Sequence, residues 1–236
     1  MNKHLSVLAM WARSNLRRVL ALLGLMAVLE TALFAVQLGR LSGGALEDLL
    51  KGVPAIAAIT LQVYMFFLCY SGDEAKGVGY TLGRLSIREE TAILWKGVCN
   101  TAYLLLFWAV QTVLAVLFAH WYAAGLDPAS RTAQTVFLAF YRVPFLHGLL
   151  PLGEWTGYVR NLLVVLGLGL ESGAAAYRWR RGGRFPLAFA MEILALTFFA
   201  KGPGELTDGM WMDVIVFLGA ALSRLSIIAT WEEGRE

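Results

Sequence analysis

Four ionisable side chains lie inside long apolar stretches of this chain, where a charged group is costly to bury. They are Glu30, Glu171, Glu192 and Arg224. At membrane depth such residues usually face the interior of a helix bundle, where they pair with one another or mark the path of a substrate or ion. The chemistry open to these carboxyls is hydrogen bonding between helices, lining of a substrate path, or proton coupling. The neutral polar residues that join them as candidates are Gln37, Gln62, Gln111 and Asn161.

Motifs for other kinds of chemistry are missing from the sequence. There is no GxxxxGK[ST] loop to cradle phosphates, so we do not expect this chain to hydrolyse ATP itself. No HExxH, GxSxG or EExxxR pattern occurs, and His4, His120 and His147 form no ligand set. Cys69 and Cys99 form no CxxC pair, and we expect both to stay reduced at cytoplasmic helix ends. We therefore predict no catalytic residue, no metal, no cofactor and no nucleic-acid partner.

The composition is that of a membrane protein. Hydrophobic residues make up 58% of the 236 residues and charged residues only 16%, whereas soluble domains have about 45–50% and about 25%. The segments 52–72 and 97–126 contain no charged residue. A helix needs about 20 apolar residues to cross the hydrocarbon core of a bilayer. We therefore predict a single, all-α transmembrane domain over residues 1–236.

Six apolar segments are predicted to cross the membrane. They are 19–38, 53–70, 98–122, 157–177, 185–200 and 210–228. With the N-terminus in the cytoplasm, fourteen of the 20 Lys and Arg residues fall on the cytoplasmic side, which agrees with the positive-inside rule. The first apolar run is too long for a secretory signal and has no small-x-small cleavage site, so we expect an uncleaved first span. Both termini are then cytoplasmic.

The segment 132–152 is the ambiguous part of this topology. It is nearly long enough to span, but Arg142 lies near its middle and Pro144 follows. A central Arg costs about 3 kcal/mol on insertion scales, and proline weakens a helix. We predict an external interfacial helix over 132–141, and a proline-bounded turn from Pro144 to Pro151; an ordinary loop that dips into the headgroups is the alternative. Tryptophans near span ends are expected to anchor the chain at the interface: Trp95, Trp108, Trp121, Trp155, Trp211 and Trp231.

The loop between the second and third predicted spans carries helix signals of its own. Asp73 can cap a short helix, and glycines then interrupt the chain. Ser86 to Glu89 matches the capping box, in which the Ser side chain bonds the N3 amide and the Glu reaches back. A new helix is therefore expected to begin near Ile87 and to run into the third span. Apolar residues between charged ones favour a docking surface on this elbow, with a solvated connector as the alternative.

The same loop resembles the coupling segment of the membrane subunits of type-2 ATP-binding-cassette exporters. In that family an Arg-Leu-(Pro/Ser)-x-x-(Arg/Ser)-Glu sequence follows a cytoplasmic coupling helix and leads into the third span. The matching residues here are Tyr80, Leu82, Arg84, Leu85, Ser86, Arg88 and Glu89, and with Ile87 they form the candidate ATPase-coupling set. The resemblance implies a basic N-terminal interfacial helix, six spans, a separate cytoplasmic ATPase and a second permease copy or paralogue. The family's re-entrant helices between spans five and six have no counterpart, because the loop 202–209 is too short for them.

The sequence therefore predicts an all-α permease subunit in a bacterial cytoplasmic membrane. Two alternatives from other classes stay open. One is a membrane-embedded enzyme that uses Glu30 or Glu192 as acid or base, and the other is a non-catalytic accessory or immunity protein. An adjacent ATPase gene would favour the permease.

Overall fold

The computed structural model describes residues 3–40, 45–70, 89–126, 132–153 and 155–180 of the protein. All of the secondary structure in these ranges is helical, which confirms the all-α prediction for this part of the chain. In chain order the helices are α1 (Lys3–Arg40), α2 (Leu46–Leu49), α3 (Val53–Tyr70), α5 (Glu89–Ala124), α6 (Ala133–Arg142), α7 (Pro144–Leu149) and α8 (Trp155–Arg180).

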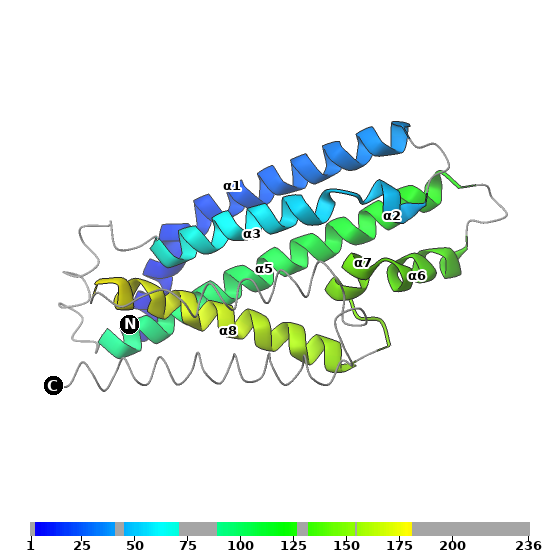
Figure 1. Cartoon of the computed structure of the whole chain (residues 1–236). Helices are drawn as coiled ribbons and strands as arrows, with labels where there is room; N and C mark the ends of the chain where they lie inside the picture. Colours follow the sequence, from blue (N-terminus) through cyan, green and yellow to red (C-terminus); the bar gives the residue numbers. More distant parts are fainter. Residues whose placement is uncertain (1–2, 41–44, 71–88, 127–131, 154, 181–236) are drawn as a thin grey trace.

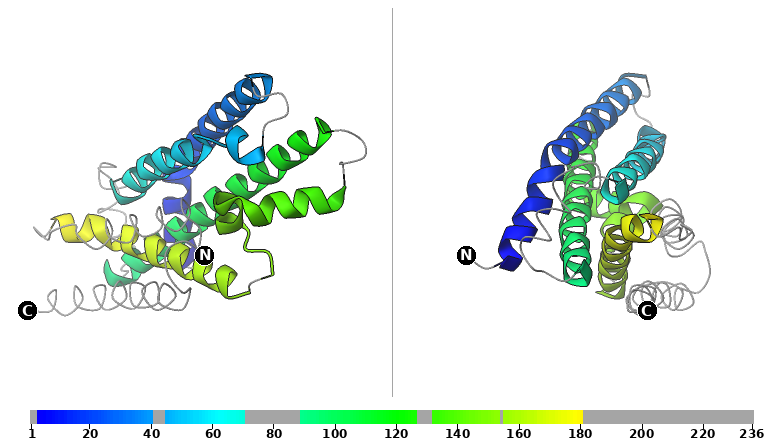
Figure 2. Two further views of the ribbon diagram at one scale, coloured as in Figure 1. Left: turned by 45° about the vertical axis from the view of Figure 1, so that its right-hand side comes forward. Right: turned by 90° about the vertical axis from the view of Figure 1, so that its left-hand side faces the viewer.

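Four long helices, α1, α3, α5 and α8, run alongside one another in alternating directions (Figures 1 and 2). The start of α1, the end of α3, the start of α5 and the end of α8 lie together, and we call this the elbow end. The short helices α2, α6 and α7 lie at the opposite end, which we call the α6 end. Because the helices alternate in direction, the helix ends that the predicted topology assigns to the cytoplasm lie at the elbow end, and those that it assigns to the outside lie at the α6 end.

The first four predicted spans fall within these long helices, and 53–70 coincides with α3. Two helical stretches, His4–Arg40 and Thr91–Ala124, are long and apolar enough to cross a membrane, whereas the apolar stretch Val53–Cys69 is shorter. The helix α5 is unbroken from Glu89 to Ala124 and so contains the whole of the predicted third span, 98–122. The predicted fifth and sixth spans and the elbow before Glu89 lie outside the described residues.

The predicted N-terminal interfacial helix is not a separate element, because residues 3–40 form one continuous helix. No glycine or proline precedes Gly24 to interrupt it. Figure 2 shows that the first part of α1 runs at an angle to the rest. Ser14 Oγ donates a hydrogen bond to the carbonyl oxygen of Trp11 at 2.9 Å, and bonds of this kind often bend a helix.

The region after the third span corrects a second prediction. The helix expected over 132–141 is present as α6, but the expected turn from Pro144 to Pro151 is wrong for its first part, which forms α7. Pro144 occupies the first turn of α7, where its fixed φ suits a helix and its missing N–H is not needed. Val143 before it is extended, as expected for a residue preceding proline.

Hydrogen bonds and aromatic contacts join α1, α3 and α5 into one core. The rings of Phe34 and Phe118 stack with centroids 4.6 Å apart. The Tyr64 hydroxyl donates to the carbonyl oxygen of Tyr103 at 2.7 Å, and the Tyr103 hydroxyl donates in turn to the carbonyl oxygen of Ala12. These two bonds tie α3 to α5 and α5 to α1.

Small residues bring α5 and α8 into backbone contact. A Cβ atom on Gly173 would lie 2.6 Å from the backbone nitrogen of Gly97, and one on Gly169 would lie 2.6 Å from the backbone of Thr101. Gly97 and Thr101 are four residues apart, as are Gly169 and Gly173. Paired small residues at this spacing allow close helix packing in membrane proteins. This contact sets how α8 lies against α5.

Replacing Gly173 with Ala is expected to destabilise the bundle by about 1–3 kcal/mol, because the added methyl group overlaps the Gly97 backbone. The matched control is Gly24→Ala in α1, where an added Cβ meets nothing within 4 Å. Alanine favours a helix over glycine by about 0.8–1.0 kcal/mol, so the control should leave stability equal or higher. Thermal unfolding in detergent measures both, and equal melting temperatures for the two variants would contradict the packing argument.

Candidate functional site

A buried hydrogen bond joins two of the polar residues that the sequence singles out. Glu30 on α1 is fully buried and Gln111 on α5 is 1% exposed. Gln111 Nε2 donates to Glu30 Oε2 at 3.0 Å. The two residues are 81 positions apart in the chain, and the packing of α1 against α5 brings them together. The pair is an interhelical polar contact inside an otherwise apolar core.

The pair leaves two acceptor atoms without a hydrogen bond. Glu30 Oε1 and Gln111 Oε1 are both buried and have no partner. Buried polar atoms in native proteins are nearly always hydrogen-bonded, and an unpaired one costs about 1–3 kcal/mol. The pair therefore joins α1 to α5 through one hydrogen bond and leaves two buried acceptors unsatisfied.

Gln111 also lines a cavity of about 60 Å³ among α3, α5, α7 and α8. The other described residues around the cavity are apolar or aromatic, among them Ala57, Phe107, Leu149 and Val164. Two hydrogen bonds hold α7 in place as one wall of this cavity. Trp108 Nε1 donates to the carbonyl oxygen of Leu149 at 3.0 Å, and Asn161 Nδ2 donates to that of Gly148 at 2.9 Å.

A second polar layer lies nearer the elbow end and connects α3, α5 and α8. Asn100 Nδ2 donates to Ser172 Oγ at 2.9 Å and to the carbonyl oxygen of Leu68 at 3.4 Å. Ser172 Oγ donates in turn to the carbonyl oxygen of Gly169 at 2.8 Å. Glu171, next to Ser172 in α8, is fully buried. Glu171 and the Glu30–Gln111 pair thus belong to different helices and different layers of the bundle.

Lys96 also belongs to the elbow end, but it is 4% exposed instead of lying in a solvated loop. Its Nζ donates to the carbonyl oxygen of Cys69 at 3.5 Å and lies 5.2 Å from the centre of the Trp11 ring. The topology argument counts Lys96 with the segment 72–97, and the structure buries it near the start of α5, among α1, α3 and α5. The hydrogen bond and the ring stabilise its charge inside the bundle.

The remaining predicted site residues are dispersed. Gln62 is exposed on α3, whereas both members of the pair are buried. Glu89 begins α5, whereas the other coupling residues, Tyr80, Leu82, Arg84, Leu85, Ser86, Ile87 and Arg88, lie outside the described residues, as does Glu192. Sequence reasoning missed Asn100 and Ser172. The small-residue spacing of Gly97 with Thr101 and of Gly169 with Gly173 was a signal for the helix contact beside them.

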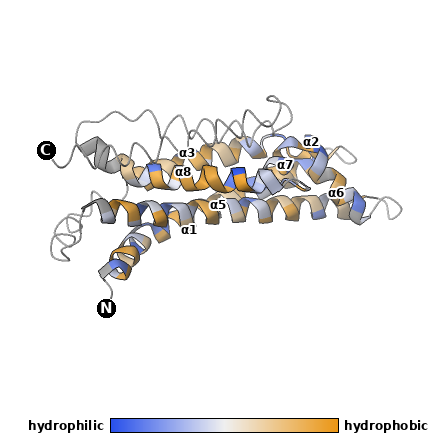
Figure 3. Cartoon of the chain, turned by 90° about the horizontal axis from the view of Figure 1, so that it is seen from below, coloured by the Kyte–Doolittle hydropathy of each residue, from blue (hydrophilic) through white to orange (hydrophobic). Residues whose placement is uncertain are grey.

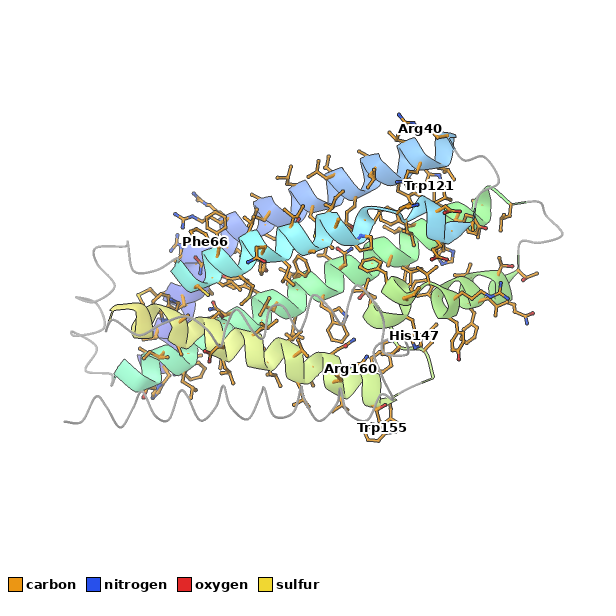
Figure 4. The ribbon with its side chains drawn as sticks, in the orientation of Figure 1. Arg40, Phe66, Trp121, His147, Trp155 and Arg160 are labelled. Carbon is orange, nitrogen blue, oxygen red and sulfur yellow. The ribbon has the colours of Figure 1, made fainter. Side chains whose placement is uncertain are left out.

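The Glu30–Gln111 pair offers a hydrogen bond between helices among the described residues. Within the described ranges, no group of three or more His, Cys, Asp or Glu side chains is placed to hold a metal ion. Glu30 is hydrogen-bonded to a neutral amide, which is not a second acid or base. Figure 4 shows the exposed Trp121 and Trp155 toward the α6 end of the helices, on α5 and α8.

A comparison with protein-family models, curated proteins and solved structures finds no match to this chain.

Truncating either member of the pair is expected to destabilise the protein, because the remaining buried polar group loses its partner. Glu30→Leu and Gln111→Leu should each lower the free energy of unfolding by about 1–3 kcal/mol. The double variant should lose less than the sum of the two, with a coupling of at least about 0.5 kcal/mol. Denaturant unfolding of all four proteins in detergent measures this, and strictly additive losses would mean that the two side chains do not interact.

Proposed function

We propose that the protein is an integral membrane protein, and the exposed surface of α1 supports this. From Leu20 to Val36 its exposed large side chains are all apolar, namely Leu20, Leu25, Val28, Leu29 and Val36. Figure 3 shows that hydrophobic residues extend along the long helices. Soluble monomers rarely expose contiguous apolar patches of more than a few hundred Å². Lipid chains are the partner that suits such a surface.

Exposed Trp and Tyr side chains support an orientation in the bilayer. Among the described residues, those counted as exposed are Trp121, Tyr141, Trp155 and Tyr158. All four come from α5 near its end, from α6 or from the start of α8, which places them toward the α6 end. Trp and Tyr favour the membrane–water interface. We place α6 at the outer interface of a bacterial cytoplasmic membrane, with six spans and both termini in the cytoplasm.

Within that topology, the function that the geometry supports best is a permease subunit of an ATP-binding-cassette exporter, with ATP hydrolysis on a separate subunit. One observation carries it: α5 is unbroken from Glu89, at the edge of the elbow, past Gln111. At 1.5 Å per residue that distance is about 33 Å. A stiff helix of this kind can transmit motion of a bound ATPase to the cavity. The partner permease is a second copy or a paralogue.

Single-cysteine labelling tests the topology. In a background with Cys69 and Cys99 replaced by Ala, Arg181→Cys should react only with a reagent that reaches the cytoplasm. Asp48→Cys and Tyr141→Cys should react with an impermeant reagent from outside, because both positions lie toward the α6 end and are exposed. Labelling of position 181 from outside would overturn the six-span topology.

Substitution in the elbow tests the ATPase partner. Leu85→Asp should leave the protein inserted but abolish co-purification with the ATPase, because a buried Leu anchor in an interface is typically worth a few kcal/mol. Ser86→Ala should reduce co-purification less, since loss of a helix cap costs about 1 kcal/mol. The matched control is Leu138→Asp, the same exchange at an exposed position on α6. If Leu85→Asp retains the ATPase, or the intact protein captures none, the permease proposal fails.

A further inference from the structure

We propose that three arginines toward the elbow end of α1 form, with the neighbouring end of α3, a binding site for an anionic phospholipid. Arg13, Arg17 and Arg18 are all exposed. They lie directly before the apolar run of α1 that begins at Val19. An anionic headgroup suits the arginines, and acyl chains suit the apolar surface that follows. The inference rests on the proposed membrane location, because that location places the apolar surface in lipid.

The acidic residues of the neighbouring described helices are distant from these arginines. The helix α1 contains no Asp or Glu before Glu30, and α3 contains no charged residue. On α5 the level of the arginines is marked by Tyr103, whose hydroxyl donates to the carbonyl oxygen of Ala12. The nearest acid before Tyr103 in α5 is Glu90, about 20 Å earlier along the helix axis. An anion from outside these helices is therefore the partner that the three charges favour.

The ring of Phe67 on α3 positions the guanidinium of Arg18 at the boundary between the two helices. Arg18 Cζ lies 5.9 Å from the centre of the ring, within the range of a cation–π contact. The N–H donors at the edge of the planar guanidinium can still bind the oxygens of a phosphate. Arg17 is adjacent in the chain, and Arg13 lies one turn before Arg17 on the same face of α1. We therefore expect the phosphate of the lipid at this boundary.

Exposed apolar side chains continue from the arginines toward the α6 end on both helices. On α1, Leu25 follows Arg18 by two turns on the same face, and on α3, Val63 lies one turn before Phe67; both are exposed. Because α1 and α3 run in opposite directions, both residues lie on the same side of the arginines along the bundle. Figure 4 shows the exposed Phe66 on α3 toward the elbow end. A phospholipid uses both the charge and this apolar surface, whereas a soluble anion uses only the charge.

Native mass spectrometry of the full-length protein, delipidated in a neutral detergent, tests this with phosphatidylglycerol and phosphatidylcholine that carry identical acyl chains. Phosphatidylglycerol should bind about tenfold tighter, because each Arg near an anionic headgroup adds to the attraction. Glycerophosphoglycerol, the same headgroup without acyl chains, should bind about tenfold more weakly than phosphatidylglycerol, because it cannot use the apolar surface. Equal affinity for the two lipids overturns the inference. Glycerophosphoglycerol that binds as tightly as the lipid overturns it as well, and identifies a site for soluble anions.

Charge-removing variants locate the site. Arg17→Gln combined with Arg18→Gln should bring phosphatidylglycerol to within about threefold of phosphatidylcholine. The matched control is Arg40→Gln combined with Arg142→Gln, the same loss of two charges at exposed positions toward the α6 end. The control should keep the full preference. A preference that survives in the Arg17 and Arg18 variant, or that falls equally in both variants, overturns the inference.

Two adjacent phenylalanines test how Arg18 is positioned. Phe67→Leu removes the ring from the guanidinium but keeps an apolar side chain, so it should reduce the preference for phosphatidylglycerol about threefold, because Arg18 is no longer held in place. Phe66→Leu is the same exchange one residue earlier and should leave the preference unchanged. Equal preferences in the two variants would overturn the role of the Phe67 ring.

The lipid measurements are made in detergent, so they fail separately from the proposed function. Labelling of position 181 from outside would overturn the six-span topology and leave the lipid site in the other leaflet. Equal binding of the two lipids would remove the lipid site and leave the topology and the ATPase partner as proposed.

Discussion

The close contact between α5 and α8 is the constraint on which the rest of the structure depends. Gly97 and Gly173 meet with no room for a Cβ atom, so the two backbones touch at the elbow end. That contact places Asn100 against Ser172 and fixes the rotation of both helices. In a membrane there is little hydrophobic driving force between helices, so van der Waals contact and such hydrogen bonds decide the register.

Farther along the same two helices, larger side chains replace the glycines. Phe107 on α5 and Val164 on α8 line the cavity. Bulkier residues keep the helices apart there, and α7 closes one side through its bonds to Trp108 and Asn161. The tight contact and the cavity are thus two regions of one helix pair. The contact lies nearer the elbow end, and the cavity lies nearer the α6 end.

The sequence could predict the helices but not how their faces meet. The long apolar blocks of the sequence predicted α1, α3, α5 and α8. A run of apolar residues long enough to form a helix can be recognised without knowing which helix packs against it. The pairing of Glu30 with Gln111 depends on the rotation and axial shift of α1 against α5, which hydrophobicity does not encode. The helix α7 was taken for a turn because Pro144 can either end one helix or begin the next, and its neighbours decide which.

The exposed Trp and Tyr side chains of the described residues lie toward the α6 end, so the two ends of the bundle differ in their surface. In the proposed orientation, interfacial Trp and Tyr hold that end at a fixed depth, whereas α1 at about 57 Å is far longer than a hydrocarbon core of about 30 Å. In a thicker or thinner bilayer the hydrophobic mismatch is therefore taken up at the opposite end, by tilt and by the depth of the basic first turns. On the proposed topology, lipid chain length sets how far the beginning of α5 projects into the cytoplasm, and so how readily a soluble partner reaches that corner.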